Sequence, residues 1–321
     1  MRLALNLLLA AATLLVSHGA AAQAWPNKPI RWILGYPPGG GTEFIARTVL
    51  NGLSERLGQP IVIENRPGAG AIIGAEVAAK SAPDGYTIFM ADNSTFVLHL
   101  GVYPKLPYDP LRDFIPVGTI VRGYMMLVTS SETRAKTVQE LIADIRSQPG
   151  KLNNASNGIG TVHHLALEVL KQRTGIDIVN IPFKGTAAVA QEVISGRVTT
   201  GFLDLSAARG HLAGGKLRAL AVASRTRLAE LPGVPTFAES GIDMEVFFWQ
   251  GIAVPANTPR DIVNRLSAAL QDTLRTPEVN KRLADAGLEV VLTTPDQMAQ
   301  LVRSDQAFWV PLVRSLNIKV E

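Results

Sequence analysis

Three consecutive glycines, Gly39 to Gly41, constrain the fold more than any other feature of the chain. Residues 30–34 before them form a short apolar run typical of a buried strand, and residues 44–57 after them have apolar side chains at helical spacing. Glycines let the backbone approach a bound group closely, and Thr42 is positioned to cap the helix. The free N–H groups of that helix start make the turn a candidate anion site. No Gly-Lys-Ser/Thr follows, so the turn is not a nucleotide P-loop.

A similar unit occurs about 120 residues later in the chain. A short strand ending at Ser156 is followed by a glycine-containing turn, residues 157–161, and by a helix with apolar residues from Val162 onward. Gly160 and Thr161 therefore match Gly41 and Thr42 in their local setting. The pair of turns predicts that two lobes present helix N-termini to one cleft.

Strand-like and helix-like runs alternate along most of the chain, which predicts an α/β fold with mainly parallel sheets. Two long apolar strands, residues 117–129 and 217–223, are expected to cross between two lobes. We therefore expect one lobe to comprise residues 25–127 and 223–321, and the other to comprise residues 128–222.

The N-terminal residues 1–24 are predicted to be a signal peptide. Arg2 provides a positive charge, residues 3–16 are an apolar run, and Ala22-Gln23-Ala24 is a cleavage signal that places the mature start near Trp25. The apolar run is too short for a good membrane span. We therefore expect export to the periplasm, and since the chain has no cysteine, stability must come from the core rather than from disulfides.

Composition and motifs argue against several function classes. The formal net charge is +4, without a long basic run, so the sequence gives little support for nucleic-acid binding. Ser156 is near His163 and His164, but no orienting third residue completes a catalytic triad. The two adjacent histidines point to different faces of a helix, and no third ligand has metal spacing. We expect no cofactor, no metal ion and no enzymatic activity.

A nucleotide-dependent α/β enzyme is the competing interpretation. Gly68, Gly70 and Gly74 follow a strand, and Asp92 ends the next strand, as in a dinucleotide-binding fingerprint. The spacing has one residue too many, and residues 65–67 separate the strand from the first glycine. The predicted exported location also offers no nicotinamide pool.

Short motifs throughout the mature chain resemble those of the periplasmic receptors of tripartite tricarboxylate transporters, the TctC-like or Bug family. The motifs that carry the resemblance are Trp25-Pro26-Asn27-Lys28-Pro29-Ile30, Pro38-Gly39-Gly40-Gly41-Thr42, Glu64-Asn65-Arg66-Pro67-Gly68-Ala69-Gly70, Pro83-Asp84-Gly85-Tyr86-Thr87, Leu106-Pro107-Tyr108-Asp109-Pro110, Pro182-Phe183-Lys184-Gly185, Pro235-Thr236, Trp249-Gln250-Gly251 and Pro255-Ala256-Asn257-Thr258-Pro259.

This resemblance implies a two-lobed type II periplasmic binding fold, a Venus flytrap with a ligand cleft between its lobes. It implies a receptor, expected to be monomeric, that delivers a small organic anion to membrane transporter subunits. Family ligands are di- and tricarboxylates, aromatic acids, or acidic amino acids and their amides. A periplasmic sensor that signals through a partner kinase remains an alternative.

The candidate ligand-binding residues come from both turns and from strand ends that the resemblance adds. Glu43 stands where the family has Asp, which adds a methylene at a position that the resemblance places in the lining of the cleft. The predicted site consists of Tyr36, Gly40, Gly41, Thr42, Glu43, Asn93, Ser94, Ser156, Gly160, Thr161, Lys184 and Asp204.

Overall fold

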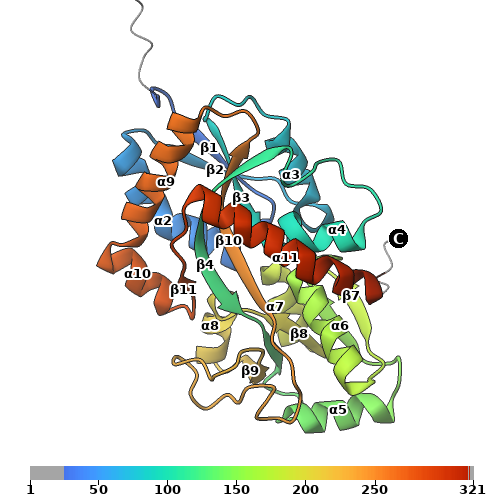
Figure 1. Ribbon diagram of the computed structural model, residues 1–321. Helices are drawn as coiled ribbons and strands as arrows, with labels where there is room; N and C mark the ends of the chain where they lie inside the picture. The colour runs from blue at the N-terminus through green and yellow to red at the C-terminus, as the bar shows by residue number, and fades with distance from the viewer. Residues whose placement is uncertain (1–24, 317, 319–321) are drawn as a thin grey trace, which may run out of the picture.

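The computed structural model describes residues 25–316 and 318, and the predicted signal peptide lies outside these residues. Two lobes, each built on its own β-sheet, lie one above the other (Figure 1). The predicted two-lobed α/β fold is thus confirmed. Over the described residues, no helix combines the length and the apolar character needed to cross a bilayer.

The first sheet has six strands in the spatial order β11-β4-β10-β3-β1-β2. Its strands are β1 (Ile30–Leu34), β2 (Ile61–Asn65), β3 (Thr87–Asp92), β4 (Phe114–Tyr124), β10 (Phe247–Pro255) and β11 (Glu289–Val290). The helices of this lobe are α2 (Gly41–Leu57), α3 (Ile72–Ala79), α4 (His99–Val102), α9 (Arg260–Leu274), α10 (Pro277–Ala284) and α11 (Pro295–Ser315), with short helical turns at Ala69–Ala71 and Ser94–Leu98.

The second sheet has five strands in the order β7-β6-β8-β5-β9. Its strands are β5 (Met126–Ser130), β6 (Asn153–Ser156), β7 (Val179–Pro182), β8 (Thr200–Leu203) and β9 (Leu217–Val222). Its helices are α5 (Val138–Ser147), α6 (Val162–Thr174), α7 (Thr186–Ile194) and α8 (Leu205–Ala213). Met126, Val128 and Leu203 share a core with the apolar faces of α7 and α8.

Both sheets are mixed, so the expectation of mainly parallel sheets is only partly right. The pairs β1–β2, β1–β3, β6–β7 and β6–β8 are parallel, because a helix connects the strands of each βαβ unit. Strand β10 runs antiparallel to β3 and β4, and β5 runs antiparallel to β8 and β9. These antiparallel strands are the ones next to the chain segments that connect the two lobes.

The apolar stretch 117–129 is two strands in different sheets, not the single predicted crossing strand. The break falls at Met125, whose N–H donates to Val246 O (3.1 Å) and whose carbonyl accepts from Ala223 N (2.8 Å). The N–H of Val246 donates to Ala223 O (3.0 Å), which closes a ring of three backbone hydrogen bonds. All three side chains are fully buried. We call Met125, Ala223 and Val246 the crossing, since the chain passes between the sheets here.

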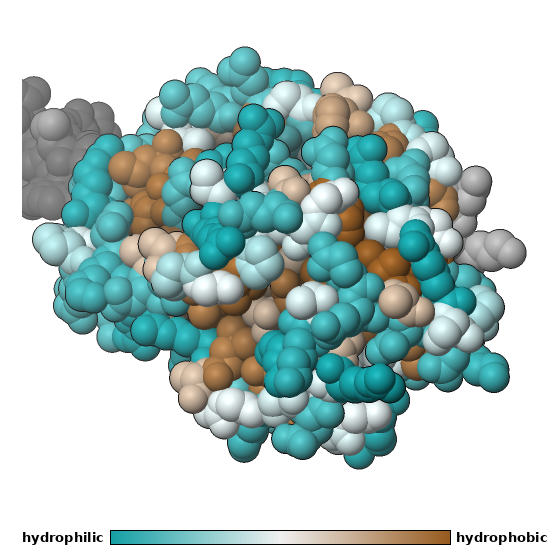
Figure 2. Space-filling view, turned by 90° about the horizontal axis from the view of Figure 1, so that it is seen from below, coloured by the Kyte–Doolittle hydropathy of each residue, from teal (hydrophilic) through white to brown (hydrophobic). Residues whose placement is uncertain are grey.

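The C-terminal helix contains a proline in its interior. Proline commonly bends or ends a helix, but α11 continues through Pro311 to Ser315. A capping box fixes its start, because Thr294 and Gln297 exchange side-chain and backbone hydrogen bonds. Seen from below, the protein surface is mainly hydrophilic with smaller hydrophobic areas between (Figure 2).

Candidate functional site

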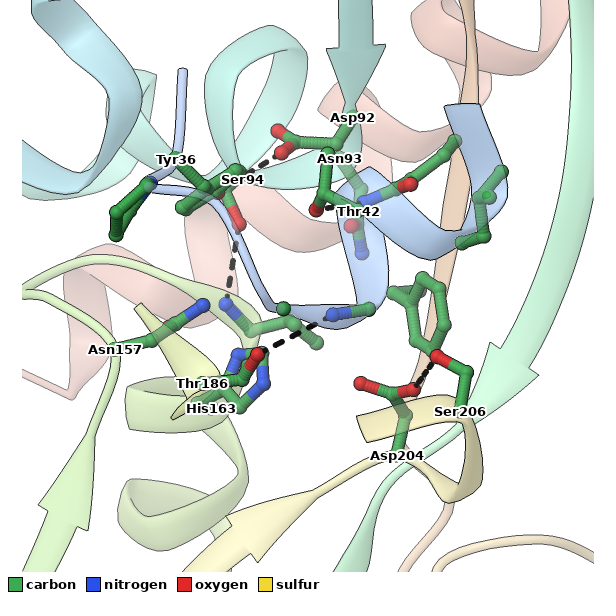
Figure 3. A pocket seen from close by; sticks show the side chains of 17 residues that line it. Tyr36, Thr42, Asp92, Asn93, Ser94, Asn157, His163, Thr186, Asp204 and Ser206 are labelled. Carbon is green, nitrogen blue, oxygen red and sulfur yellow. Dashed lines mark hydrogen bonds between the residues drawn. The ribbon is translucent and has the colours of Figure 1, made fainter. Parts of the chain in front are cut away.

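A cleft between the lobes is lined by residues from both lobes and adjoins the carboxyl ends of β1, β3, β6 and β8. This is where ligands bind in α/β sheets. The first lobe contributes Tyr36, Pro37, Gly40, Gly41, Thr42, Ile45, Asp92, Asn93, Ser94, Phe248 and Gln250, and the second contributes Asn157, Val162, His163, Thr186, Asp204 and Ser206. The polar side chains of the two groups face each other across the cleft (Figure 3).

The first glycine turn brings the start of α2 to the cleft. Helix α2 begins at Gly41 with Gly40 as its N-cap, so Thr42 is inside the first turn and does not cap the helix as predicted. Its hydroxyl instead accepts a hydrogen bond from Gln250 Nε2 (2.7 Å). Across the cleft, the N–H of Gly41 donates to Thr186 Oγ1 (3.4 Å). The turn therefore lies at the cleft with its helix start facing the opposite lobe.

Glu43 lies outside the cleft lining and holds the turn together. Its Oε2 accepts from the N–H of Gly39 (2.5 Å), and its Oε1 accepts from Arg47 Nε (2.8 Å). The Gly39 hydrogen bond is the main cause that lowers the pKa of Glu43, with a smaller contribution from Arg47. Glu43 thus stabilises the helix start, where a negative charge is favourable.

The second glycine turn reaches the cleft through Val162 and His163. The N–H of Val162, the first residue of α6, donates to Ser94 Oγ (3.2 Å) in the opposite lobe. Thr161 is the N-cap residue by position, but its hydroxyl donates to Gly158 O (2.8 Å). The N–H of Gly160 donates to His164 Nδ1 (3.3 Å). Ser156, Gly160 and Thr161 therefore support the turn from behind and do not line the cleft.

A buried carboxylate positions Tyr36 at the edge of the cleft. Tyr36 Oη donates to Asp92 Oδ2 (2.9 Å), and Thr95 donates to Asp92 Oδ1 through its N–H (2.7 Å) and its hydroxyl (2.8 Å). Burial raises the pKa of Asp92, and the hydrogen bonds from Thr95 and Tyr36 offset part of that rise. Both oxygens of Asp92 thus have partners within the first lobe.

Asp204 faces the cleft from the second lobe. It is the N-cap of α8, and its Oδ1 accepts from the N–H of Ala207 (3.2 Å) and from the hydroxyl of Ser206. Burial raises the pKa of the Asp204 carboxyl. A Cβ at Gly41 would lie 3.2 and 3.3 Å from the two carboxylate oxygens, so this group reaches the start of α2.

Several polar atoms of the cleft have no hydrogen-bond partner among the described residues. They are Asn93 Oδ1, Asn157 Oδ1, Gln250 Oε1 and both ring nitrogens of His163. Each of these side chains is more than nine-tenths buried. Buried polar groups are costly without a hydrogen bond, so these are the atoms of the cleft that can bond to a ligand or to water.

Lys184 belongs to a neighbouring cavity rather than to the cleft. That cavity is also interlobe and shares Tyr36, Pro37 and Asn157 with the cleft, and it is lined further by Tyr103 and the glycine-rich segment 67–71. Seven predicted residues line the cleft itself: Tyr36, Gly40, Gly41, Thr42, Asn93, Ser94 and Asp204.

The sequence analysis missed Asp92, Asn157, Thr186 and Gln250 as cleft residues, and gave His163 no role there. Asp92 is the last residue of β3 and Asn157 directly follows β6, and both adjoin predicted residues, so the carboxyl end of each strand was the available signal. Thr186 and Gln250 had no comparable signal, because they meet Gly41 and Thr42 only through the contact between distant segments.

We expect the protein to lose stability as the pH falls below about 6.5 because of two buried histidines. Burial lowers the pKa of His163 and of His99 to about 3, against 6.5 for the free side chain. The unfolded chain binds protons more readily in this window, so stability present above pH 6.5 is lost towards pH 3. Each histidine should lower the free energy of unfolding by about 2 kcal/mol between pH 7 and pH 5.

Urea unfolding of wild type and His163→Gln at the two pH values measures this effect. The variant should lose about 2 kcal/mol less than wild type on acidification. Asp92 and Asp204 have raised pKa values, so acidification favours the folded state at these two groups. This effect opposes that of the histidines and is the same in wild type and the variant. An identical pH dependence of the two proteins would show that His163 is not buried in its neutral form.

Comparison with known proteins identifies the family. Residues 45–318 match the model of the tripartite tricarboxylate transporter family receptor. BugT of Bordetella pertussis is 33% identical over 312 residues, covering 97% of this chain and 96% of BugT. The structure of Rpa4515 of R. palustris with adipate has a TM-score of 0.89 and 31% identity, covering 92% of this chain and 99% of that one.

The structure of MatC from Rhodopseudomonas palustris with bound malate is also 31% identical, with a TM-score of 0.86, and covers 90% of this chain and 100% of that one. The match to the family model spans most of the chain, and the cleft lies between two lobes as in a binding protein. The chain therefore belongs to the tripartite tricarboxylate transporter receptor family, whose members are periplasmic solute-binding receptors and not enzymes.

Proposed function

We propose that this protein binds a small organic acid in the interlobe cleft and delivers it to the membrane subunits of a tripartite transporter. The observation that carries the proposal is that α2 and α6 begin on opposite sides of one cleft and that each contacts the other lobe there. Each helix start carries about half a positive charge, so an anion between them is stabilised by both lobes. The relatives with bound adipate and malate support an acid as the ligand.

The binding residues in this proposal are Gly40, Gly41 and Thr42 of the first lobe and Val162 and His163 of the second. Gly40 and Thr42 each have an N–H at the start of α2. His163 is uncharged at neutral pH and can donate one ring N–H. Recognition of the acid therefore relies on neutral donors and helix ends rather than on an arginine.

We further propose that the two lobes open and close about the crossing. Strand β4 leads into it at Tyr124, and β10 leaves it at Phe247. The intervening segment 224–246 packs on the second lobe, where Phe237 stacks on Phe202 with ring centres 6.2 Å apart. We therefore assign residues 25–124 and 247–316 to one lobe and residues 126–246 to the other, in place of a boundary at residue 223.

Export to the periplasm is part of the same proposal. Residues 1–24 have the composition of a signal peptide. Trp25, the expected mature N-terminus, packs against Tyr86 with ring centres 6.2 Å apart, and its carbonyl accepts from Arg265 (2.5 Å). A chain that begins at Trp25 therefore has its first residue anchored on the fold, and we propose that it acts as a monomer.

A screen of the mature protein against organic acids tests the proposed function by thermal shift. An acid present at 100 times its dissociation constant should add about 2.7 kcal/mol to the free energy of unfolding. The shift should grow with ligand concentration, as mass action requires. A protein that responds to NAD and to none of the acids would contradict the proposal and favour the nucleotide-dependent alternative.

A further inference from the structure

The start of each cleft helix is bonded to a hydroxyl group of the opposite lobe. The N–H of Gly41, the first residue of α2, donates to Thr186 Oγ1 in the second lobe (3.4 Å). The N–H of Val162, the first residue of α6, donates to Ser94 Oγ in the first lobe (3.2 Å). Both hydrogen bonds are drawn as dashed lines in Figure 3. The lobes therefore hold each other by a reciprocal pair of contacts.

These contacts are buried and leave little room in the cleft. Ser94 is 2% exposed and Thr186 is 8% exposed. The hydroxyl of Ser94 also forms a hydrogen bond with Tyr36 of its own lobe. The cleft encloses about 30 Å³, which is enough for one or two water molecules and too little for an organic acid. An acid can therefore occupy the helix starts only after both hydroxyl groups have moved away from them.

Two further contacts join the lobes beside the cleft. Tyr103 Oη of the first lobe donates to the carbonyl of Ile159 in the second lobe (3.3 Å). The backbones of Gly70 and Gly158 also meet, because a Cβ at Gly158 would lie 3.0 Å from Gly70 Cα. Each of these contacts joins protein atoms directly. Contacts between the lobes are therefore sufficient to bring the two helix starts together.

We propose that Ser94 and Thr186 compete with the acid for the two helix starts and hold the protein in a self-closed state. The inference rests on the proposed function above and concerns the regulation of the same cleft. In the self-closed state, each hydroxyl oxygen accepts the hydrogen bond that the proposed function gives to a carboxylate oxygen. The acid displaces the hydroxyl groups, because hydrogen bonds to a charged acceptor are stronger than those to a neutral one.

Competition of this kind lowers the apparent affinity for the acid. Only molecules that are not self-closed can bind, so the apparent dissociation constant is the intrinsic constant divided by their fraction. A hydroxyl group that competes with the acid weakens binding, whereas a hydroxyl group that contacts the acid strengthens it. The two roles therefore predict opposite signs for the effect of removing these hydroxyl groups.

The experiment removes both hydroxyl groups in the double variant Ser94→Ala, Thr186→Val, since valine keeps the shape of threonine. The N–H groups of Gly41 and Val162 then have no acceptor in the self-closed state, which is unfavourable for buried groups. Calorimetry of the mature protein with adipate and with malate should show an affinity about twofold to tenfold higher than that of wild type. Small-angle scattering without any acid should show a larger radius of gyration for the variant.

A matched control removes one hydroxyl group from each lobe outside the cleft. Ser81 Oγ donates to Val77 O, and Thr174 Oγ1 donates to Leu170 O, so both bonds lie within one lobe. The double variant Ser81→Ala, Thr174→Val should bind and scatter as wild type does. Thr186→Val alone should change affinity and scattering in the same direction as the first double variant, with a smaller effect.

Two results would overturn the inference and leave the proposed function in place. One is that the variant without Ser94 and Thr186 hydroxyl groups binds the acids with wild-type or lower affinity. The other is that its radius of gyration without acid equals that of wild type. The proposed function is overturned by a different result, namely that no acid of the thermal-shift screen binds the wild-type protein.

Discussion

Gly41→Val is expected to prevent the two lobes from closing on a ligand. A Cβ at Gly41 would lie 2.6 Å from Ser206 Oγ, which is closer than real Cβ contacts. Ser206 cannot easily move away, since its hydroxyl is bound to Asp204. Overpacking of this kind costs about 1–3 kcal/mol, so affinity for the acid should fall about tenfold to a hundredfold. Small-angle scattering should show no compaction when the ligand is added.

Gly210→Val provides the matched control for this prediction. Gly210 is an exposed position in α8, the helix of the second lobe that also carries Ser206, and a Cβ there has no neighbour within 4 Å. The control should bind and compact as wild type does. Gly160 is a less suitable target, because its φ of +75° makes any β-branched residue strained whatever the lobes do. Normal compaction of Gly41→Val would show that the lobes do not meet at this glycine.

Phe96→Ala should destabilise the first lobe by about 3–5 kcal/mol. The ring is fully buried in an aromatic cluster, with ring centres 5.3 Å from Phe114 and 6.4 Å from both Phe89 and Trp249. Loss of the side chain removes its transfer free energy and leaves a cavity between these rings. Urea unfolding followed by tryptophan fluorescence measures the change, because Trp249 belongs to the same cluster.

Phe308→Ala removes the same side chain from the surface of α11, where Phe308 is 66% exposed. Its stability should stay within about 1 kcal/mol of wild type, as for most surface substitutions. Equal losses in the two variants would contradict the aromatic core described here.

The sequence was sufficient to predict local strand–turn–helix units, but it was insufficient to predict contacts between segments that are distant in the chain. The unit from Ile30 through the glycines to α2 was predictable, because apolar periodicity and glycine chemistry act within a few residues. The direction of a side chain from a turn was not predictable. Thr42 and Thr161 were both expected to face the cleft, yet Thr161 turns to Gly158 O while Thr42 meets Gln250.

The crossing shows a second limit of sequence patterns. Residues 117–129 are mainly apolar, which predicts one strand, and nothing at Met125 itself marks a break. The break depends on hydrogen bonds to Ala223 and Val246, about 100 residues or more away in the chain. Lys184 illustrates the same limit, because a family motif made it a candidate ligand residue but the fold places it in the adjacent cavity.

The closed ring of hydrogen bonds at Met125, Ala223 and Val246 determines how many ways the lobes can move. The three backbone segments are joined by hydrogen bonds that form a closed ring, and all three residues are fully buried. Sliding or twisting one segment against another would break these buried hydrogen bonds, which is costly. Bending across the three backbones is the remaining low-energy motion. If the lobes open and close as proposed, we therefore expect a single bending motion that brings Gly41 and Thr186 back to the same contact at each closure.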